Sequence, residues 1–182
     1  MTLTHLDIEA LLKCCLENDP AAQREVYNRY YKAMYNTALR IVKDSAEAED
    51  IMQESFLTAF TKLNTFKGEA SFGSWLKRIV VNSSINAYKK KVRLGEVPLD
   101  NTLYKLADEP TQTPCDTSNL QVQKVIQSMN ELKENYRMAL NLHLIEGYDY
   151  KEVSTILKIS YANCRTTISR AKESLRKKLI TS

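Results

Sequence analysis

The segment from Asp149 to Arg176 has residue types that recognise bases in duplex DNA. Asp149 and Glu152 have the spacing of a capping box, which opens a short helix, and a turn at Ile159-Ser160 leads into a longer basic helix. This is the pattern of a helix-turn-helix, in which arginine can bond guanine, asparagine can bond adenine and later cations contact phosphates. The candidate DNA-contacting residues are Tyr161, Asn163, Arg165, Thr166, Ser169, Arg170, Lys172 and Arg176. The alternative is an ordinary amphipathic helix with a solvated basic face.

A second group of cations, amides and aromatic rings suits a single nucleic-acid strand. The helix expected from Trp75 to about Arg93 places one polar stripe on the same side as Trp75. Cations on such a stripe can follow a phosphate backbone while an aromatic ring stacks on exposed bases. The candidate residues on this stripe and in the loop before it are Phe66, Lys67, Phe72, Trp75, Arg78, Asn82, Asn86, Lys89 and Arg93. Burial of Phe72 or Trp75 in a core is the alternative.

A third segment, Glu47–Phe56, carries acidic and amide side chains that suit a basic partner. Charged helix faces are more often simply solvated, so the segment by itself is interpreted as a solvated face.

The distribution of charge suggests two contacts with a polyanion, and the alternative is a pair of solvated basic helix faces. Residues 61–95 and 119–182 are net positive, whereas residues 1–60 and 96–118 are net negative, although the whole chain carries only +4.

All three groups of candidate residues lie on or next to segments whose sequence pattern predicts a helix. Apolar residues recur every three or four positions, capping residues precede the repeats, and strand alternation is absent from the sequence. Helices are expected over Asp7–Glu17, Pro20–Val42, from Asp44 or Ser45 to Phe60, Trp75–Arg93, Leu120–Met129, Asn135–Ile145, after Asp149 and after Ser160. The fold class is therefore predicted to be all-α.

A stretch without any helical stripe divides the chain. It contains Gly95, Pro98, Pro110 and Pro114 among acidic and small polar residues. A structureless stretch of this length is unusual inside one compact domain. We therefore expect two helical domains, residues 1–93 and 119–182, joined by a flexible acidic linker over residues 94–118.

Composition excludes several other classes of protein. No apolar run is long enough to span a membrane, and the first residues lack the basic and apolar regions of a secretory signal. The four cysteines and two histidines have the spacing of neither a zinc site nor a disulfide scaffold. His143 lacks the Glu-x-x-His pairing of a helical-bundle metalloenzyme. We expect a cytoplasmic protein with reduced cysteines, no metal, no cofactor and no catalytic residue.

Taken together and in order, these segments resemble a bacterial RNA polymerase sigma factor of the sigma-70 family, in the small extracytoplasmic-function (ECF) group. The family typically has glycine in the helix-turn-helix turn, where this chain has Lys158. A residue other than glycine in a left-handed turn costs roughly 1 kcal/mol. The segments that carry the resemblance are Ala48–Phe56, Phe72–Asn82, Tyr136-Arg137, Ile145–Gly147, Tyr150–Val153, Leu157–Ser160 and Ser169–Lys172.

The resemblance implies a division of work between the two domains. Residues 1–93 resemble sigma region 2, which binds the polymerase core and recognises and melts the −10 promoter element. Residues 119–182 resemble region 4, whose helix-turn-helix reads the −35 element as a duplex. The resemblance also adds Lys77 and Lys90 to the −10 group as phosphate contacts. It implies that the polymerase core is bound by Glu49, Asp50, Ile51, Gln53, Glu54 and Phe56.

The implied function is promoter-specific transcription initiation without enzymatic activity of the chain's own. The implied partners are the RNA polymerase core, through its β′ clamp helices and β flap, promoter DNA, and an anti-sigma factor, with no direct membrane contact. The alternative is a stand-alone helix-turn-helix regulator with an N-terminal sensing or dimerisation domain. Such a regulator binds duplex DNA by itself, often as a dimer at a symmetric site.

Overall fold

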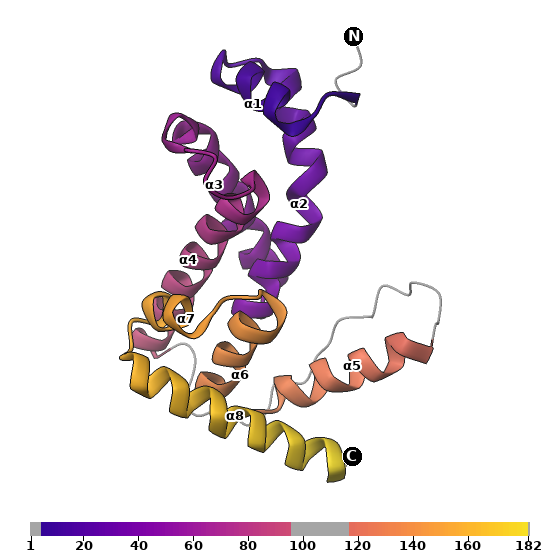
Figure 1. The fold of residues 1–182 in the computed structure, drawn as a ribbon, viewed down its shortest axis with the longest axis vertical. Coiled ribbons are helices and arrows are strands. Elements are labelled where there is room, and N and C mark those ends of the chain that lie inside the picture. Colours follow the sequence, from indigo (N-terminus) through magenta and orange to yellow (C-terminus); the bar gives the residue numbers. More distant parts are fainter. Residues whose placement is uncertain (1–4, 96–116, 182) are drawn as a thin grey trace. The chain divides into compact units, whose positions relative to one another are not determined.

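The computed structural model describes residues 5–95 and 117–181, and every regular element within these ranges is a helix (Figure 1). The prediction of an all-α fold is confirmed. The chain divides into two compact units, Met1–Lys90 and Lys91–Ser182. Most of the predicted linker lies outside the described residues, so its flexibility and the domain boundaries at residues 93 and 119 stay predictions.

The first three helices of the first unit begin where local sequence signals predict. The carboxylates of Asp7, Asp19 and Asp44 each accept a backbone N–H of the following turn, at 2.7, 2.8 and 2.9 Å. Such caps satisfy donors that a helix leaves unpaired at its start. The elements are α1 (Ile8–Leu16), α2 (Pro20–Val42), α3 (Ser45–Thr61), the short 3₁₀ turn η2 (Leu63–Thr65) and α4 (Phe72–Arg93).

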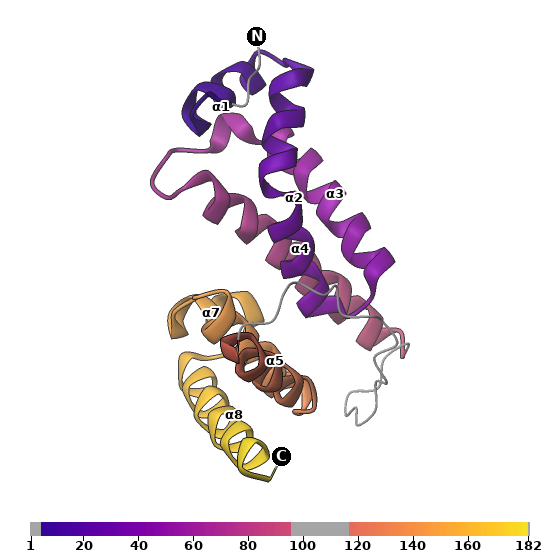
Figure 2. The same cartoon turned by 90° about the vertical axis from the view of Figure 1, so that its right-hand side faces the viewer.

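Apolar side chains from all of these elements form one buried cluster. Helix α2 lies against both α1 and α3, as Figure 2 shows. Helix α4 joins the cluster through its first turns, where a Cβ atom on Gly73 would lie 2.9 Å from Cε1 of Tyr30. A larger residue at position 73 would therefore displace the Tyr30 ring. The cluster includes Leu11, Val26, Met34, Met52, Phe56, Leu63, Phe72, Leu76 and Val80.

Helix α4 begins at Phe72, whereas the sequence predicts a start at Trp75. The hydroxyl of Ser71 accepts the backbone N–H of Ser74 at 3.2 Å, and the Ser71 carbonyl accepts that of Trp75 at 3.0 Å. Ser71 thus caps the helix, and Gly73 lies inside its first turn rather than in the loop before it. The earlier start places Phe72 on the core side of α4.

In the second unit, α8 provides the surface on which the other helices pack. It lies against α5, α6 and α7. Its predicted apolar face is buried at Cys164, Ile168, Ala171 and Leu175. The elements are α5 (Thr117–Asn130), α6 (Glu134–Leu140), the π-helical turn η3 (Asn141–Ile145), α7 (Tyr150–Leu157) and α8 (Tyr161–Thr181).

The predicted helix-turn-helix is present in α7 and α8. The capping box forms as predicted: the backbone N–H of Glu152 donates to Asp149 at 2.7 Å, and that of Asp149 donates to Glu152 at 2.9 Å. Lys158 ends α7 in the left-handed conformation, with φ of 57°. The Ser160 hydroxyl accepts the backbone N–H of Asn163 at 3.2 Å, which caps the start of α8.

Two helices of the second unit differ from their predicted extents. Helix α5 begins at Thr117 rather than at Leu120. The helix predicted over Asn135–Ile145 changes to a π turn after Leu140, where the N–H of Glu146 donates to the carbonyl of Asn141 at 2.9 Å. Gly147, with φ of 81°, then ends the segment. His143 lies in this turn, and its ring packs against that of Tyr150 in α7.

The cysteines of α1 differ in exposure. Cys15 belongs to the buried core, and Cys14 is half-buried. Burial raises the pKa of the Cys15 thiol to about 11, and the neighbouring Cys14 and Asp19 add to the rise. The thiolate is the form that reacts with alkylating agents, so its population controls reactivity.

Iodoacetamide at about pH 8 is expected to modify Cys14 well before Cys15. Peptide mass spectrometry distinguishes the two residues, and in denaturant both are expected to react at similar rates. Equal rates in the native protein would contradict the burial of Cys15.

The raised pKa of Cys15 also predicts that the stability of the first unit falls as pH rises from 9.0 towards about 11. In this range the unfolded chain releases the Cys15 proton while the folded chain retains it.

Candidate nucleic-acid interface

The predicted duplex-binding residues lie on the side of α8 opposite its buried face. All of them are exposed except Lys172, which is half-buried. The Thr166 hydroxyl donates to the Ala162 carbonyl at 3.0 Å, and the Thr167 hydroxyl donates to Asn163 Oδ1 at 3.3 Å. These short-range bonds restrain side chains along the outer face of the helix.

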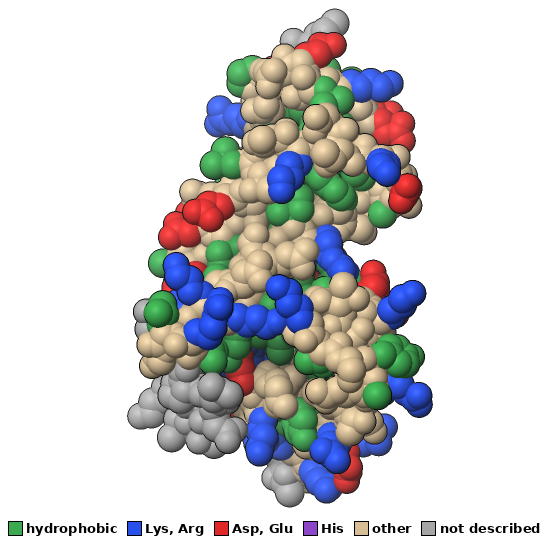
Figure 3. Space-filling view, turned by 90° about the vertical axis from the view of Figure 1, so that its left-hand side faces the viewer, with side chains coloured by type: hydrophobic (Ala, Val, Ile, Leu, Met, Phe, Trp, Pro, Cys, Tyr) green, Lys and Arg blue, Asp and Glu red, His purple; other side chains and the backbone are tan. Residues whose placement is uncertain are grey.

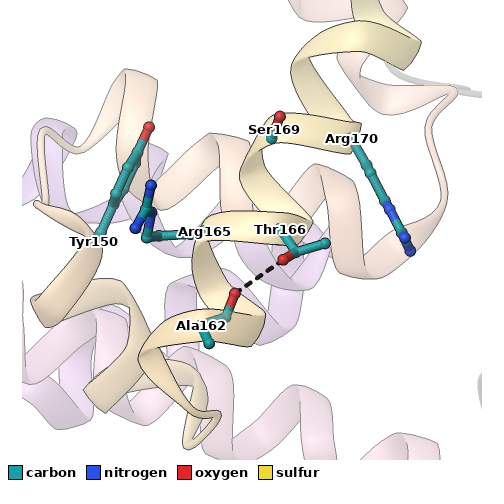
Figure 4. Close-up of a pocket in the computed structure, with 6 residues that line it drawn as sticks. All are labelled: Tyr150, Ala162, Arg165, Thr166, Ser169 and Arg170. Carbon is teal, nitrogen blue, oxygen red and sulfur yellow. Dashed lines mark hydrogen bonds between the residues drawn. The ribbon is translucent and has the colours of Figure 1, made fainter.

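An open pocket of about 610 Å³ lies on this face of α8, as Figure 4 shows. Arginine side chains from two successive turns of the helix border it, which gives the pocket a positive charge suited to phosphates and base acceptors. The lining residues are Tyr150, Ala162, Arg165, Thr166, Ser169 and Arg170. The structure therefore brings four of the predicted residues together and leaves outside the lining Tyr161, Asn163, Lys172 and Arg176.

Tyr150 lines the pocket, although the sequence does not single it out as a site residue. It is the first residue of α7, and its backbone carbonyl accepts the thiol of Cys164 at 3.3 Å. Burial raises the pKa of Cys164, which keeps this thiol protonated and able to donate. The available signal was the position of Tyr150 directly after the capping residue Asp149, at the end of α7 that approaches α8.

Three aromatic residues gather at the start of α4 in the first unit. The ring centroids of Phe66 and Trp75 are 5.4 Å apart, and each is 5.8 Å from the centroid of Phe72. Phe66 and Trp75 are half-buried, so part of each ring faces solvent. Phe72 is only 3% exposed, and the prediction that it contacts DNA is wrong. Its ring packs against Tyr30 and supports the other two.

The polar stripe along α4 follows the predicted spacing. Its amides, Asn82 and Asn86, are exposed, and Leu76 and Val80 are buried on the opposite side. Lys67, in the loop before α4, is also exposed. Among the cations of the helix, Lys90 and Arg93 are exposed, while the half-buried ones are Lys77, Arg78 and Lys89. The stripe therefore offers amides and cations to solvent beside the aromatic pair Phe66–Trp75.

The acidic segment forms an exposed face of α3. Glu49, Asp50, Gln53 and Glu54 are all exposed, and the Gln53 amide donates to Glu49 at 3.2 Å. Next to them, the apolar side chain of Leu57 is 68% exposed, although the sequence pattern does not single it out. Its position one turn after the polar group was the available signal.

Two residues predicted to contact the polymerase core lie inside the first unit instead. Ile51 is 7% exposed and Phe56 is 2% exposed. The Phe56 ring packs against Tyr27 and Phe60, with centroid distances of 4.8 and 6.1 Å. A direct contact through either side chain is therefore a wrong prediction. Both residues hold α3 against the core and so fix the direction of its acidic face.

The charged side chains intersperse with small apolar areas on the face shown in Figure 3, where lysine and arginine are more frequent than acidic residues. Near the end of α8, Lys177 lies 3.0 Å from Glu173 and lowers the pKa of that carboxyl group.

The described residues contain no cluster of three or more histidine, cysteine or acidic side chains that could hold a metal ion. Among the same residues, no helix has the length and apolar character needed to cross a membrane.

Comparison with known proteins adds family relationships to this geometry. The family model "Sigma-70 region 2" matches residues 26–94, and the family model "Sigma-70, region 4" matches residues 123–175. A solved structure with a similar fold is the sigma factor RpoE of Bartonella quintana, in complex with the anti-sigma factor NepR. It has a TM-score of 0.61 and 21% identity, over 86% of this chain and 95% of that chain.

Two curated relatives match nearly the whole chain. The RNA polymerase sigma-H factor of Pseudomonas aeruginosa is 27% identical, over 97% of this chain and 96% of its own length. The ECF RNA polymerase sigma factor SigM of Bacillus subtilis is 30% identical, over 84% of this chain and 91% of its own length. With regions 2 and 4 in order along two helical units, the chain belongs to the ECF group of sigma-70 family RNA polymerase sigma factors.

Proposed function

We propose that this sigma factor binds core RNA polymerase, directs it to specific promoters and reads the −35 element as a duplex and the −10 element as a melted strand. The observation that carries the proposal is the presence of regions 2 and 4 on separate helical units, with cations exposed on α4 and on α8. The chain supplies binding energy and sequence recognition. The polymerase core supplies the catalysis, and the complex acts in the cytoplasm.

Helix α8 is suited to the major groove of the −35 duplex. Its exposed residues close to the N-terminus of the helix, Asn163, Arg165 and Thr166, would face base edges. The cations further along, Arg170, Lys172 and Arg176, would contact phosphates and set the register of the helix. Because the opposite side of α8 is buried against α6 and α7, the reading face has a fixed direction.

Replacing Arg165 with alanine is expected to weaken binding to a −35 duplex by about 1–3 kcal/mol and to relax preference at one base pair. The physical reason is loss of a bidentate contact to a base edge. Selection from a randomised −35 library by the polymerase complex measures both effects. Arg176→Ala is the matched control, because loss of a phosphate contact weakens all sequences alike. An unchanged preference in Arg165→Ala would contradict base recognition by Arg165.

The start of α4 is suited to capturing an unpaired base of the −10 element. Phe66 and Trp75 each expose part of a ring, and the amides of Asn82 and Asn86 lie further along the same helix. Extruding a base costs a few kcal/mol, which stacking and hydrogen bonds in a protein pocket offset. Lys67, Lys77, Arg78, Lys89, Lys90 and Arg93 would contact the backbone of the same strand.

The acidic face of α3 is suited to the polymerase core. Its four exposed polar residues can pair with basic groups, and Leu57 adds an apolar anchor beside them. In protein interfaces, charged groups steer association while buried apolar side chains supply much of the affinity. We place the contact with the β′ clamp helices on this face, whereas contact with the β flap belongs to the second unit.

Reversing charge with Asp50→Lys and Glu54→Lys together is expected to weaken binding to core polymerase at least about tenfold, because like charges then meet across the interface. Fluorescence anisotropy of the labelled chain titrated with bacterial core polymerase measures this affinity. Glu9→Lys on α1 and Glu17→Lys directly after it form the control, since together they change net charge equally on another exposed surface. Equal losses in both variants would contradict a specific role of α3.

A DNA library separates the proposed function from that of a stand-alone regulator. Two spaced motifs selected only in the presence of core polymerase support the sigma factor. A palindromic duplex selected by the chain alone would contradict it. The stand-alone regulator is not favoured, because that function has no need of region 2, which matches residues 26–94.

An anti-sigma factor is the remaining partner of the proposal. The similar structure of RpoE was determined with the anti-sigma factor NepR bound, which supports a partner of this class for the present chain. Such a partner would compete with core polymerase or promoter DNA for the surfaces of α3, α4 or α8.

A further inference from the structure

Tyr150 is the first residue of α7, and it contacts residues of both η3 and α8. Its ring centroid is 4.7 Å from that of His143, and Nζ of Lys172 is 5.9 Å from the Tyr150 ring centroid. Its backbone carbonyl accepts the Cys164 thiol at 3.3 Å. Since both the backbone and the ring have neighbours, Tyr150 presents a stable aromatic surface beside the outer face of α8.

His143 packs next to the Tyr150 ring. Nδ1 of His143 lies 2.9 Å from the Tyr148 carbonyl oxygen, so Nδ1 carries a proton and donates to that oxygen. The π turn over Asn141–Ile145 brings His143 to this position. The Tyr150 ring is thus supported by a side chain that is itself anchored to the backbone.

One cation of α8, Lys172, lies next to this ring, and a second, Arg165, lines the same pocket as Tyr150. Figure 4 shows the Arg165 side chain pointing from α8 toward Tyr150. The face of an aromatic ring attracts cations, and arginine can also stack on it. A long side chain that is restricted before binding loses less conformational entropy when its partner arrives.

We propose that Tyr150 is a positioning residue for promoter recognition, whose ring holds Arg165 and Lys172 in their DNA-binding orientations before DNA arrives. This inference rests on the proposed function, in which Arg165 reads a −35 base and Lys172 contacts a phosphate. Tyr150 then affects base preference through Arg165. Its hydroxyl group has no part in this role, which depends on the ring alone.

The test compares Tyr150→Leu, which removes the ring, with Tyr150→Phe, which keeps it. Each full-length variant is combined with core polymerase and competed against promoters that differ only at the base pair read by Arg165. Tyr150→Leu is expected to reduce the preference at that base pair by about threefold to tenfold, the range of a cation–π contact. Tyr150→Phe is expected to retain the wild-type preference. Circular dichroism checks that both variants are folded.

Combining Tyr150→Leu with Arg165→Ala tests whether Tyr150 affects base preference through Arg165. In that background Tyr150→Leu is expected to leave the base preference unchanged, because the side chain that it positions is absent. If Tyr150→Leu keeps the wild-type preference at the base pair read by Arg165, the inference is overturned. It is also overturned if Tyr150→Phe loses as much of this preference as Tyr150→Leu does. An equal loss of preference at every −35 position would also overturn it, because that is the effect of a damaged fold. If the wild-type complex has no −35 preference, the proposed function fails as well.

Discussion

Replacing Phe72 with alanine is expected to lower the free energy of unfolding of the first unit by about 3–5 kcal/mol. The ring is almost fully buried and lies between Tyr30, Phe66 and Trp75, with centroid distances of 5.4, 5.8 and 5.8 Å. Its removal leaves a cavity at the place where α4 joins the core. Urea unfolding followed by tryptophan fluorescence measures the loss, because Trp75 is the only tryptophan of the chain and lies next to the cavity.

Phe72→Leu is the matched control. It keeps most of the buried volume, so its expected cost is below about 1.5 kcal/mol. At a temperature where both variants are folded, Phe72→Leu is also expected to retain binding to a single-stranded −10 oligonucleotide in the polymerase complex. Wild-type stability in Phe72→Ala together with lost −10 binding would restore a direct contact between Phe72 and DNA.

The same comparison tests how the candidate base pocket is built. Phe66 and Trp75 are half-exposed and belong to different segments, the loop before α4 and α4 itself. Phe72 is the ring that both contact. Phe66→Ala is therefore expected to weaken −10 binding with a smaller loss of stability than Phe72→Ala, because its ring is less buried.

Removing the carboxylate of Glu134 is expected to destabilise the second unit by about 3 kcal/mol. Arg137 is 0% exposed, and its Nε donates to both carboxylate oxygens of Glu134, at 2.9 and 3.0 Å. A second guanidinium nitrogen, Nη2, also donates to Glu134. Taking away one partner of a buried ion pair costs far more than losing a surface pair, because the remaining charge stays desolvated. Urea unfolding of Glu134→Ala, followed by far-ultraviolet circular dichroism, measures this cost.

Glu131→Ala provides the control three residues earlier in the chain. Glu131 pairs with Lys178 at 3.0 Å, but both side chains are substantially exposed to solvent. The expected cost is therefore below about 1 kcal/mol. Trp75 fluorescence is expected to be unchanged in both variants, since it reports on the first unit. Equal, small losses in the two variants would contradict a buried charge at Arg137.

The Arg137 pair is also expected to be replaceable as a unit. Glu134→Leu combined with Arg137→Met removes both charges and keeps apolar volume, so most of the stability lost in Glu134→Ala should return. Helix α6 packs against α8, and the pair therefore supports the helix that carries the candidate DNA-reading residues. If recognition of the −35 element needs the packing of α6 against α8 but not the two charges, the double variant is expected to retain the −35 preference.

Local sequence signals predict correctly where most helices begin and which face of each is apolar. Asp19 with Pro20, Asp149 with Glu152, and Ser160 act on backbone groups within one turn, so their effect depends on nearby residues alone. The family relationship was also visible, because region 2 and region 4 motifs follow each other in order along the chain.

Tertiary structure decided which members of a motif reach the surface. Ile51, Phe56 and Phe72 share segments with exposed polar residues, yet the packing of α2, α3 and α4 buries them. Helical periodicity alone does not settle such positions at the edge of an apolar stripe, because a neighbouring helix can cover either side.

Contacts between residues far apart in the sequence could likewise not be predicted from sequence patterns. The ring of Tyr150 meets Lys172 only because α7 and α8 pack together, and His143 reaches Tyr150 only because the helix widens into a π turn after Leu140. Arg137 is a surface residue by type, and its burial depends on α8 covering α6. Local physics set the helices, and their mutual packing set the surfaces that they offer to DNA and polymerase.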